Sequence, residues 1–477
     1  MNIEPFWKFS GKGAVTIDEG LLVNFLSEIG FASYYQTDNL TVEPVYLYKD
    51  KWIVEPIIST RIHTETIRAI QNGIINEDLL PRELRKDLIA KLISSKTLTK
   101  KEVLACLPEL EKPVITDTAY EARFFYNNGI VTVTGDRISL TDSDINDCYV
   151  WKSRLMNRKF TPCPLEELDE SEYGLFLKNI SGSKVDCLFQ HNQERFKSLM
   201  SLIGYMLHSY KDCSNPRSLI LMDASLSDEP RGRTGKGLLV KGLGKLHKVS
   251  IQDGKTFDTR NRFRFSDVDA DVDIVLIDDV PKDFNFELFF SLITEGITIE
   301  AKYANKYFIP FEKSPKIVIT TNYTVKGIGS SHEARKYEYE LSNYYSEKFT
   351  PKDEFGHLLF TDWSTTDWMH FDNLNMQCVK YYLKNGVYIP ASYDVDYKKF
   401  VSSTSHDFAE WIESKTLGID TRYFKSELYA DYSQFCEGQP EIKNNEMNRY
   451  LRSYAKYKGL KFKDDHVGNR RYVEFNR

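Results

Sequence analysis

The clearest alternation of apolar and polar segments lies between residue 217 and about residue 345. Short apolar runs end in polar residues in RSLILMDA, VDIVLIDDV and SPKIVITTNY, and GKGLLVKGLGKL has helical spacing. Continuous apolar strands bounded by polar loops are typical of parallel strands that are covered on both faces. The order of strand, helix, strand, hairpin and strand therefore predicts an α/β fold with a central parallel sheet.

The segments on either side predict further units. The first mixes strand-like runs with a charged helical stretch, which indicates an α+β accessory domain. The second opens with strands around Asn128-Gly129, a turn signal, and the α/β core follows behind an amphipathic helix at 191–212. A helical connector follows the core. The last unit has helical patches and then the strands LKFKDD and RRYVEF, which is the order of a winged-helix domain. The predicted units are 1–115, 116–190, 191–345, 346–404 and 405–477.

Composition narrows the class of protein. The chain has 477 residues, too many for one compact core, and its 41% apolar and 28% charged residues are ordinary for a soluble globular protein. Seven cysteines without a CxxC pair argue against a disulfide framework or a zinc ribbon and favour a reducing compartment. With no apolar leader and no run long enough to span a membrane, we expect a cytoplasmic protein of a bacterial host cell with no membrane partner.

Charge is distributed unevenly along the chain. The net charge is −6, but residues 441–477 carry ten Lys or Arg against five Asp or Glu, a local charge of +5. This asymmetry points to nucleic acid at the C-terminal end. We predict that Arg470 and Arg471, on the second strand of the pair, contact DNA phosphates. The alternative is a domain that docks a partner protein.

The residues after the first core strand have the pattern of a phosphate-binding loop. In SLSDEPRGRTGKGLL a glycine-rich loop leads into a helix, where backbone N–H groups and the helix dipole favour phosphate and Lys236 supplies a cation. The match to G-x-x-x-x-G-K-[ST] is imperfect, because Pro230 stands at the first Gly position and Gly237 at the hydroxyl position that binds Mg²⁺. Thr234, water and a later acidic pair would then hold the metal. The predicted ATP-binding residues are Gly232, Arg233, Thr234, Gly235, Lys236, Gly237 and Leu238.

Two later strands end in polar residues that suit the same chemistry. IVLIDDV ends in Asp278-Asp279, and KIVITTNY ends in Asn322. Ligands collect at the carboxyl ends of parallel strands, and Mg²⁺ prefers oxygen ligands. We predict that Asp278 binds Mg²⁺, that Asp279 polarises the attacking water, and that Asn322 orients this water and senses the γ-phosphate. An isolated Asp-Asp would be read as a solvated turn, but three strand ends in this order indicate a P-loop ATPase.

At this point the chain resembles the superfamily 3 DNA helicases, with an AAA+-like core, and in particular the primase-helicases of phages, plasmids and poxviruses. In that family a DNA-contacting hairpin lies between the acidic motif and the polar sensor, where this chain has ITIEAKY and KYFIPF. The resemblance implies that Lys302 and Lys306 project toward a central pore; otherwise this is a charged surface hairpin. It also implies that Arg335 is an arginine finger that reaches a neighbour's nucleotide, with Lys336 a poorer substitute.

These observations predict a ring-forming, Mg²⁺- and ATP-dependent DNA helicase for the replication of a phage, plasmid or integrated element. We expect a homo-oligomeric ring, a hexamer by resemblance, that acts on single-stranded and forked DNA, and the family implies 3′→5′ travel. No primase constellation is visible, so primer synthesis would come from a separate primase or replication protein. The alternatives are an origin initiator or loader and a nucleotide-gated DNA-binding assembly module without processive unwinding.

Overall fold

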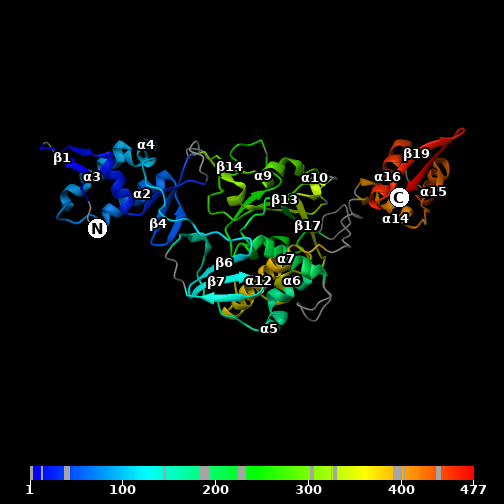
Figure 1. Cartoon of the computed structure of the whole chain (residues 1–477), viewed down its shortest axis with the longest axis horizontal. Coiled ribbons are helices and arrows are strands. Elements are labelled where there is room, and N and C mark those ends of the chain that lie inside the picture. The colour runs from blue at the N-terminus through cyan, green and yellow to red at the C-terminus, as the bar shows by residue number, and fades with distance from the viewer. Residues whose placement is uncertain are drawn as a thin grey trace.

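The computed structural model has three lobes, with the N-terminal and C-terminal lobes on opposite sides of a central one (Figure 1). In the described part of the chain, no helix is both long enough and apolar enough to cross a bilayer. The structure describes all residues except 1–3, 12–13, 37–42, 143–146, 183–193, 224–231, 259, 301–305, 324, 326–329, 390–399, 402, 416 and 437–441.

The N-terminal lobe is a mixed α/β unit, in keeping with the predicted α+β region. Strands β3, β4 and β5 form an antiparallel sheet, to which β9 from the following segment adds in parallel. Helices α1 to α4 and the hairpin β1–β2 enclose a core of their own beside this sheet. The bounds are β1 Trp7–Phe9, β2 Val15–Ile17, α1 Glu19–Glu28, β3 Phe31–Tyr34, β4 Val45–Asp50, β5 Ile53–Pro56, α2 Ser59–Gln71, α3 Arg82–Ser95, α4 Lys101–Leu104 and β9 Val150–Trp151.

A second sheet, in the order β10-β6-β7-β8, precedes the core. The predicted turn at Asn128-Gly129 joins β6 to β7, and a Cβ at Gly129 would lie 2.3 Å from the Thr141 carbonyl oxygen, so only glycine fits there. Helices α5, α6 and α7 follow. The bounds are β6 Glu121–Tyr126, β7 Gly129–Thr134, β8 Ile138–Thr141, β10 Leu155–Met156, α5 Leu165–Glu170, α6 Glu172–Ser181 and α7 Glu194–Leu207.

The central lobe is built on a five-stranded parallel sheet in the order β12-β13-β16-β11-β17. The predicted mixed α/β fold with a parallel sheet is confirmed. Alternate residues of β11 enter different cores: Leu219 and Leu221 pack with α7 and α8, and Ile220 and Met222 pack with α9 and the hairpin β14–β15. The bounds are β11 Ser218–Asp223, α8 Lys236–Leu243, β12 Val249–Asp253, β13 Ile274–Val280, α9 Phe290–Thr294, β14 Gly296–Ile299, β15 Tyr307–Pro310, β16 Lys316–Thr321, α10 Ser330–Glu333 and β17 Lys336–Leu341.

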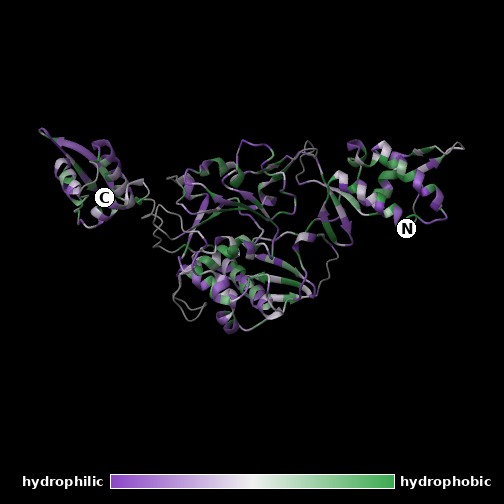
Figure 2. Ribbon diagram, turned by 180° about the vertical axis from the view of Figure 1, so that it is seen from behind, coloured by the Kyte–Doolittle hydropathy of each residue, from purple (hydrophilic) through white to green (hydrophobic). Residues whose placement is uncertain are grey.

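The predicted helical connector contains α11 (Pro351–Phe355) and the 21-residue α12 (Thr365–Asn385). Helix α12 crosses α7 so closely that a Cβ at Gly204 would lie 2.2 Å from the Cys378 carbonyl oxygen. Arg158, before α5, donates two hydrogen bonds to Asp372 of α12, at 2.8 and 2.6 Å. One hydrophobic cluster therefore runs across the predicted boundaries at 190 and 345, and in Figure 2 hydrophobic segments gather where these helices pack. The boundaries themselves stay predictions.

The C-terminal lobe has its own core, to which helices α14, α15 and α16 and a three-stranded sheet in the order β18-β20-β19 contribute. The predicted final pair of strands is present, and its turn is shorter than expected because His466 and Val467 pair with Arg471 and Arg470. The hairpin they form is hydrophilic (Figure 2). The bounds are α14 His406–Glu413, β18 Arg422–Phe424, α15 Lys425–Phe435, α16 Asn444–Tyr457, β19 Lys461–Val467 and β20 Arg470–Asn476.

Candidate functional site

Polar side chains from three strands and one helix meet at the carboxyl edge of the parallel sheet. Lys236, the first residue of α8, donates from Nζ to a carboxylate oxygen of Asp223, the last residue of β11, and to Asn322 Oδ1 at 2.9 Å. Asn322, after β16, donates from Nδ2 to Asp279 Oδ1 at 3.2 Å. Three of the predicted catalytic side chains, Lys236, Asn322 and Asp279, are thus joined in one chain of hydrogen bonds.

The described part of the predicted phosphate loop begins at Gly232, since Pro230 lies outside the described residues. Gly235 has φ +107°, and a Cβ there would lie 2.9 Å from Ile180 Cγ2, so this turn into α8 requires glycine. Arg233 is exposed, with its guanidinium 4.0 Å from the Glu347 carboxylate. A Cβ on Gly237 would meet nothing within 4 Å, so packing does not explain the missing hydroxyl. Leu238 is half-buried behind it.

Asp223 is a site residue that the sequence motif did not identify. Its side chain is 2% exposed, and the same oxygen that accepts from Lys236 also accepts from the buried Thr234 hydroxyl. The sequence feature that could have identified Asp223 is an aspartate at the end of the apolar run LILMD. The same pattern identified Asp278 on β13.

The acidic pair sits at an irregular point of β13, where the register shifts between Ile277 and Val280. Thr320 of β16 joins both residues: its hydroxyl donates to Asp278 Oδ1 at 2.6 Å and accepts from the Asp279 backbone N–H at 2.8 Å. Asp279 has φ +56°, an uncommon conformation for a non-glycine residue that is found preferentially at functional sites. The carboxylate of Asp278 contacts Thr320, whereas that of Asp279 contacts Asn322.

Lys255 is a second residue that the motifs did not reveal. It follows Gly254, whose N–H donates to the Asp278 carbonyl oxygen at 2.6 Å and whose Cβ, if present, would lie 2.5 Å from that oxygen. This close approach brings Lys255 Nζ to 2.6 Å from Asp279 Oδ2. The hydrogen bond to Asp279 raises the pKa of Lys255, so the ammonium stays charged.

Exposed cations continue along the loop after Lys255. Arg260 is 90% exposed and lies 3.2 Å from Asp258, and Arg262 is 70% exposed and lies 3.6 Å from Glu300. Because Glu300 directly follows β14, where the chain enters the turn of the predicted DNA-contacting hairpin, this basic loop lies beside the turn end of β14.

The hairpin itself is partly described. Strands β14 and β15 pair from Gly296–Pro310 to Ile299–Tyr307, which matches the expected pair of strands. Lys302 lies outside the described residues. Lys306 directly precedes β15 and is exposed.

Arg335 lies at the opposite edge of the sheet from Lys236. It directly precedes β17, and its carbonyl oxygen accepts from Ser218 N at the amino end of β11. The five residue steps from Ser218 to Asp223 span about 17 Å. The guanidinium lies over the Phe290 ring, 4.6 Å from its centroid, and donates to the Ser331 carbonyl oxygen at 2.9 Å. Lys336 is buried and contacts Glu338, which leaves Arg335 as the accessible cation of the two.

The predicted cations of the C-terminal lobe differ in their surroundings. Both Arg470 and Arg471 are exposed, and Arg470 also stacks on Phe424, 3.7 Å from the ring centroid, and contacts Glu427 at 2.5 Å. Sequence reasoning missed a further set on α16, where Arg449, Arg452 and Lys456 are exposed at helical spacing. Arg452 lies over Phe462 of β19, which places this basic stripe next to the hairpin β19–β20.

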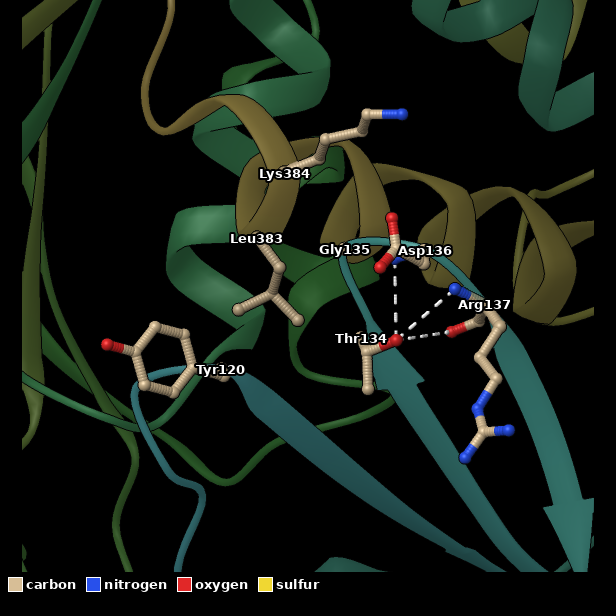
Figure 3. Close-up of a pocket in the computed structure, with 7 residues that line it drawn as sticks. All are labelled: Tyr120, Thr134, Gly135, Asp136, Arg137, Leu383 and Lys384. Atoms are coloured by element: carbon tan, nitrogen blue, oxygen red, sulfur yellow. Dashed lines mark hydrogen bonds between the residues drawn. The ribbon is translucent and has the colours of Figure 1, made fainter.

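A separate pocket of about 650 Å³ lies between the β7–β8 turn and the end of α12, and Tyr120, Gly135 and Leu383 are among its lining residues (Figure 3). Thr134 caps the turn by accepting from the N–H groups of Asp136 and Arg137, at 3.4 and 3.2 Å. None of the predicted site residues lines this pocket.

Among the described residues, no three His, Cys, Asp or Glu side chains gather as a metal-binding group. Mg²⁺ commonly binds through one or two carboxylates, water and the substrate's phosphates. Asp278 on β13 and Thr234 before α8 both offer oxygen atoms at this edge of the sheet, and oxygen donors suit such a shared shell.

No family model and no curated protein matches the sequence. Among solved structures, the A-form apo structure of the NrS-1 C-terminal region is 13% identical, with a TM-score of 0.44, and the alignment covers 96% of this chain and 98% of that one. A structure of the JCV helicase with a bound compound is 14% identical, with a TM-score of 0.23, covering 52% of this chain and 72% of that one. Both likenesses are too distant to carry an argument about function.

Proposed function

We propose that this chain is an ATP-dependent DNA helicase of the superfamily 3 type, acting in the replication of a phage, plasmid or integrated element. The observation that carries the proposal is the connected set Lys236, Asn322 and Asp279 at the carboxyl edge of the parallel sheet. Ligands bind at this edge in open α/β sheets. The start of α8 adds a helix N-terminus, which favours phosphate.

Each residue has a role that its position supports. Lys236 binds the β- and γ-phosphates, and Asn322 and Asp279 hold the attacking water in line with the γ-phosphorus. Asp278, with Thr234, belongs to the shell of Mg²⁺, which would neutralise charge on the phosphates. Thr320 fixes both aspartates, because one hydroxyl bonds the side chain of Asp278 and the backbone of Asp279.

The proposal includes a ring, a hexamer by family resemblance, because the position of Arg335 favours action on a neighbouring chain. A guanidinium about 17 Å along the sheet from Asp223 is out of reach of its own phosphate site. Its stacking on Phe290 fixes it near the amino ends of β11 and β17. A neighbour that places its carboxyl edge against this surface would receive Arg335 as an arginine finger.

Two basic surfaces would contact DNA. A single strand in the pore would contact Lys302, Lys306 and the exposed Arg260 and Arg262. The family resemblance implies 3′→5′ travel along this strand. The C-terminal lobe would act as a winged-helix domain on duplex DNA, through the α16 stripe and Arg471.

The test is ATP hydrolysis with and without forked DNA, beside strand displacement on the same fork. A motor shows DNA-stimulated hydrolysis and displacement, a loader mainly the stimulation, and a nucleotide-gated assembly module neither. Lys236→Ala should lose both activities, whereas Lys241→Ala, on the exposed face of the same helix, should keep them. Normal hydrolysis by a folded Lys236→Ala chain would refute the nucleotide site.

A further inference from the structure

At the proposed nucleotide site, the carboxylate of Asp223 lies where an anionic ligand would bind and contacts the same donor groups. It is a carboxylate with 2% side-chain exposure at the end of β11, and one of its oxygens accepts from both Thr234 and Lys236. These residues flank Gly235, the N-terminal cap of α8. A helix N-terminus with a converging ammonium and hydroxyl is a favourable position for any negative charge.

The same donors are the ones that a nucleotide phosphate would need. An ammonium group has three N–H donors, and Lys236 directs two of them to Asp223 and Asn322. A phosphate that arrives at the start of α8 meets a lysine already neutralised by a carboxylate. It also brings more negative charge close to Asp223, which is buried where water screens charge poorly.

We propose that Asp223 is a built-in competitor of the nucleotide's phosphates, a role that rests on the proposed ATP site. Its carboxylate holds Lys236 and Thr234 while the site is empty and yields them when a triphosphate binds. The negative charge thereby lowers affinity for both ATP and ADP and speeds the exchange of product for substrate. A group that only supported the fold would instead favour binding, because it would keep the lysine in place.

The experiment compares nucleotide binding by the full chain and by Asp223→Asn, which keeps the size and both accepted hydrogen bonds but removes the charge. We expect the Asn variant to bind ATP and ADP about tenfold more tightly, equivalent to ~1.4 kcal/mol, and to release ADP more slowly. Adenosine, which has no phosphate, should bind both chains equally. Asp223→Glu retains the charge and is the matched control, so it should show no gain.

Each outcome of this experiment supports or contradicts either the nucleotide site or the role of Asp223. If the wild-type chain binds no ATP, the proposed function fails. If the wild-type chain binds ATP and the Asn variant binds it equally or more weakly, only the role of Asp223 fails. Equal tightening for adenosine would also overturn it, since the effect would then not involve phosphate. Melting curves check folding, and Asp223→Ser, which is neutral and can still accept hydrogen bonds, repeats the comparison if the Asn variant does not fold.

Discussion

At the scale of single residues, Asp279 is engaged at both carboxylate oxygens. Asn322 donates to Oδ1 at 3.2 Å, and Lys255 lies 2.6 Å from Oδ2. An ammonium group next to a carboxylate makes its oxygens weaker bases toward water, so the contact with Lys255 opposes the proposed role of Asp279. Lys255 is 66% exposed and exposed ion pairs are weak, so in the proposed helicase a DNA phosphate on the adjoining basic loop would draw the lysine away.

Lys255→Gln should therefore raise ATP hydrolysis without DNA several-fold and reduce the further stimulation by DNA. Steady-state turnover with and without forked DNA measures both effects. Arg260→Gln is the matched control, because Arg260 is exposed on the same loop but contacts Asp258 instead of Asp279, and its DNA-free rate should stay at the wild-type level. A slower DNA-free rate for Lys255→Gln would mean that the lysine supports catalysis.

The sequence predicted the residues whose position in an element was enough to identify them. Asp278 and Asn322 follow apolar runs, and Lys236 opens a helix after a glycine. Thr320 and Lys255 were missed because their roles depend on partners 42 and 24 residues away, across neighbouring strands. Such pairings follow from the strand order, in which β16 lies between β13 and β11, and local patterns do not encode that order.

At the scale of elements, α16 carries a basic surface of the C-terminal lobe. Arg449, Arg452 and Lys456 follow the helix at spacings of three and four residues, while Met447, Leu451 and Tyr454 face the core. One face of α16 therefore packs on the core and the other faces solvent. The three cations lie on the solvent face, and the hydrophilic hairpin β19–β20 is next to it (Figure 2). A helix of this kind suits phosphate contacts along a duplex groove.

Replacing Arg449, Arg452 and Lys456 by alanine should weaken duplex binding and leave DNA-free ATP hydrolysis unchanged. Each lost phosphate contact reduces the slope of log affinity against log salt by about 0.9, so the slope should fall by roughly 2 to 3. Binding titrations at several salt concentrations measure it.

The control removes the same charge elsewhere, by alanine at the exposed Lys8, Arg82 and Lys86 of the N-terminal lobe. That chain should bind duplex DNA as the wild type does. If the α16 variant also keeps the wild-type slope, the lobe is better explained as a docking domain for a protein.

The prediction of strands succeeded where burial produces a simple pattern along the sequence. Strands β11, β13 and β16 are buried on both faces, so their apolar runs are continuous and easily recognised. The N-terminal sheet could not be read in the same way. It takes β9 from residues 150–151, beyond the predicted boundary at 115, and a strand of two residues has no periodicity to detect.

At the scale of the whole molecule, the two halves of the proposed catalytic machinery face opposite ways. Lys236 and Asp279 lie at the carboxyl edge of the sheet, and Arg335 precedes β17 at its amino edge. One chain therefore offers a phosphate site in one direction and a guanidinium in the other. This arrangement supports head-to-tail contacts between identical subunits, which form a ring when the rotation from one subunit to the next closes.

Mixing two inactive variants tests this arrangement. Arg335→Ala should bind ATP and hydrolyse it slowly, since arginine fingers contribute about 10³-fold or more in rate, and Lys236→Ala should lack turnover. In a mixture some interfaces combine a sound phosphate site with a sound finger, so part of the wild-type ATPase should return. If the subunits demonstrably exchange and the mixture stays inactive, Arg335 acts within its own subunit or only supports its structure.

With Arg335 as the proposed arginine finger, catalysis would depend on the concentration of the chain. A guanidinium that cannot reach its own phosphate site would leave the active centre incomplete until a second copy binds. On dilution, turnover per chain should then fall, with a steeper than linear loss of total rate. In a cell the same dependence would set a threshold in copy number: few molecules would remain idle, and a rise in expression would switch on ATP consumption without any separate activator.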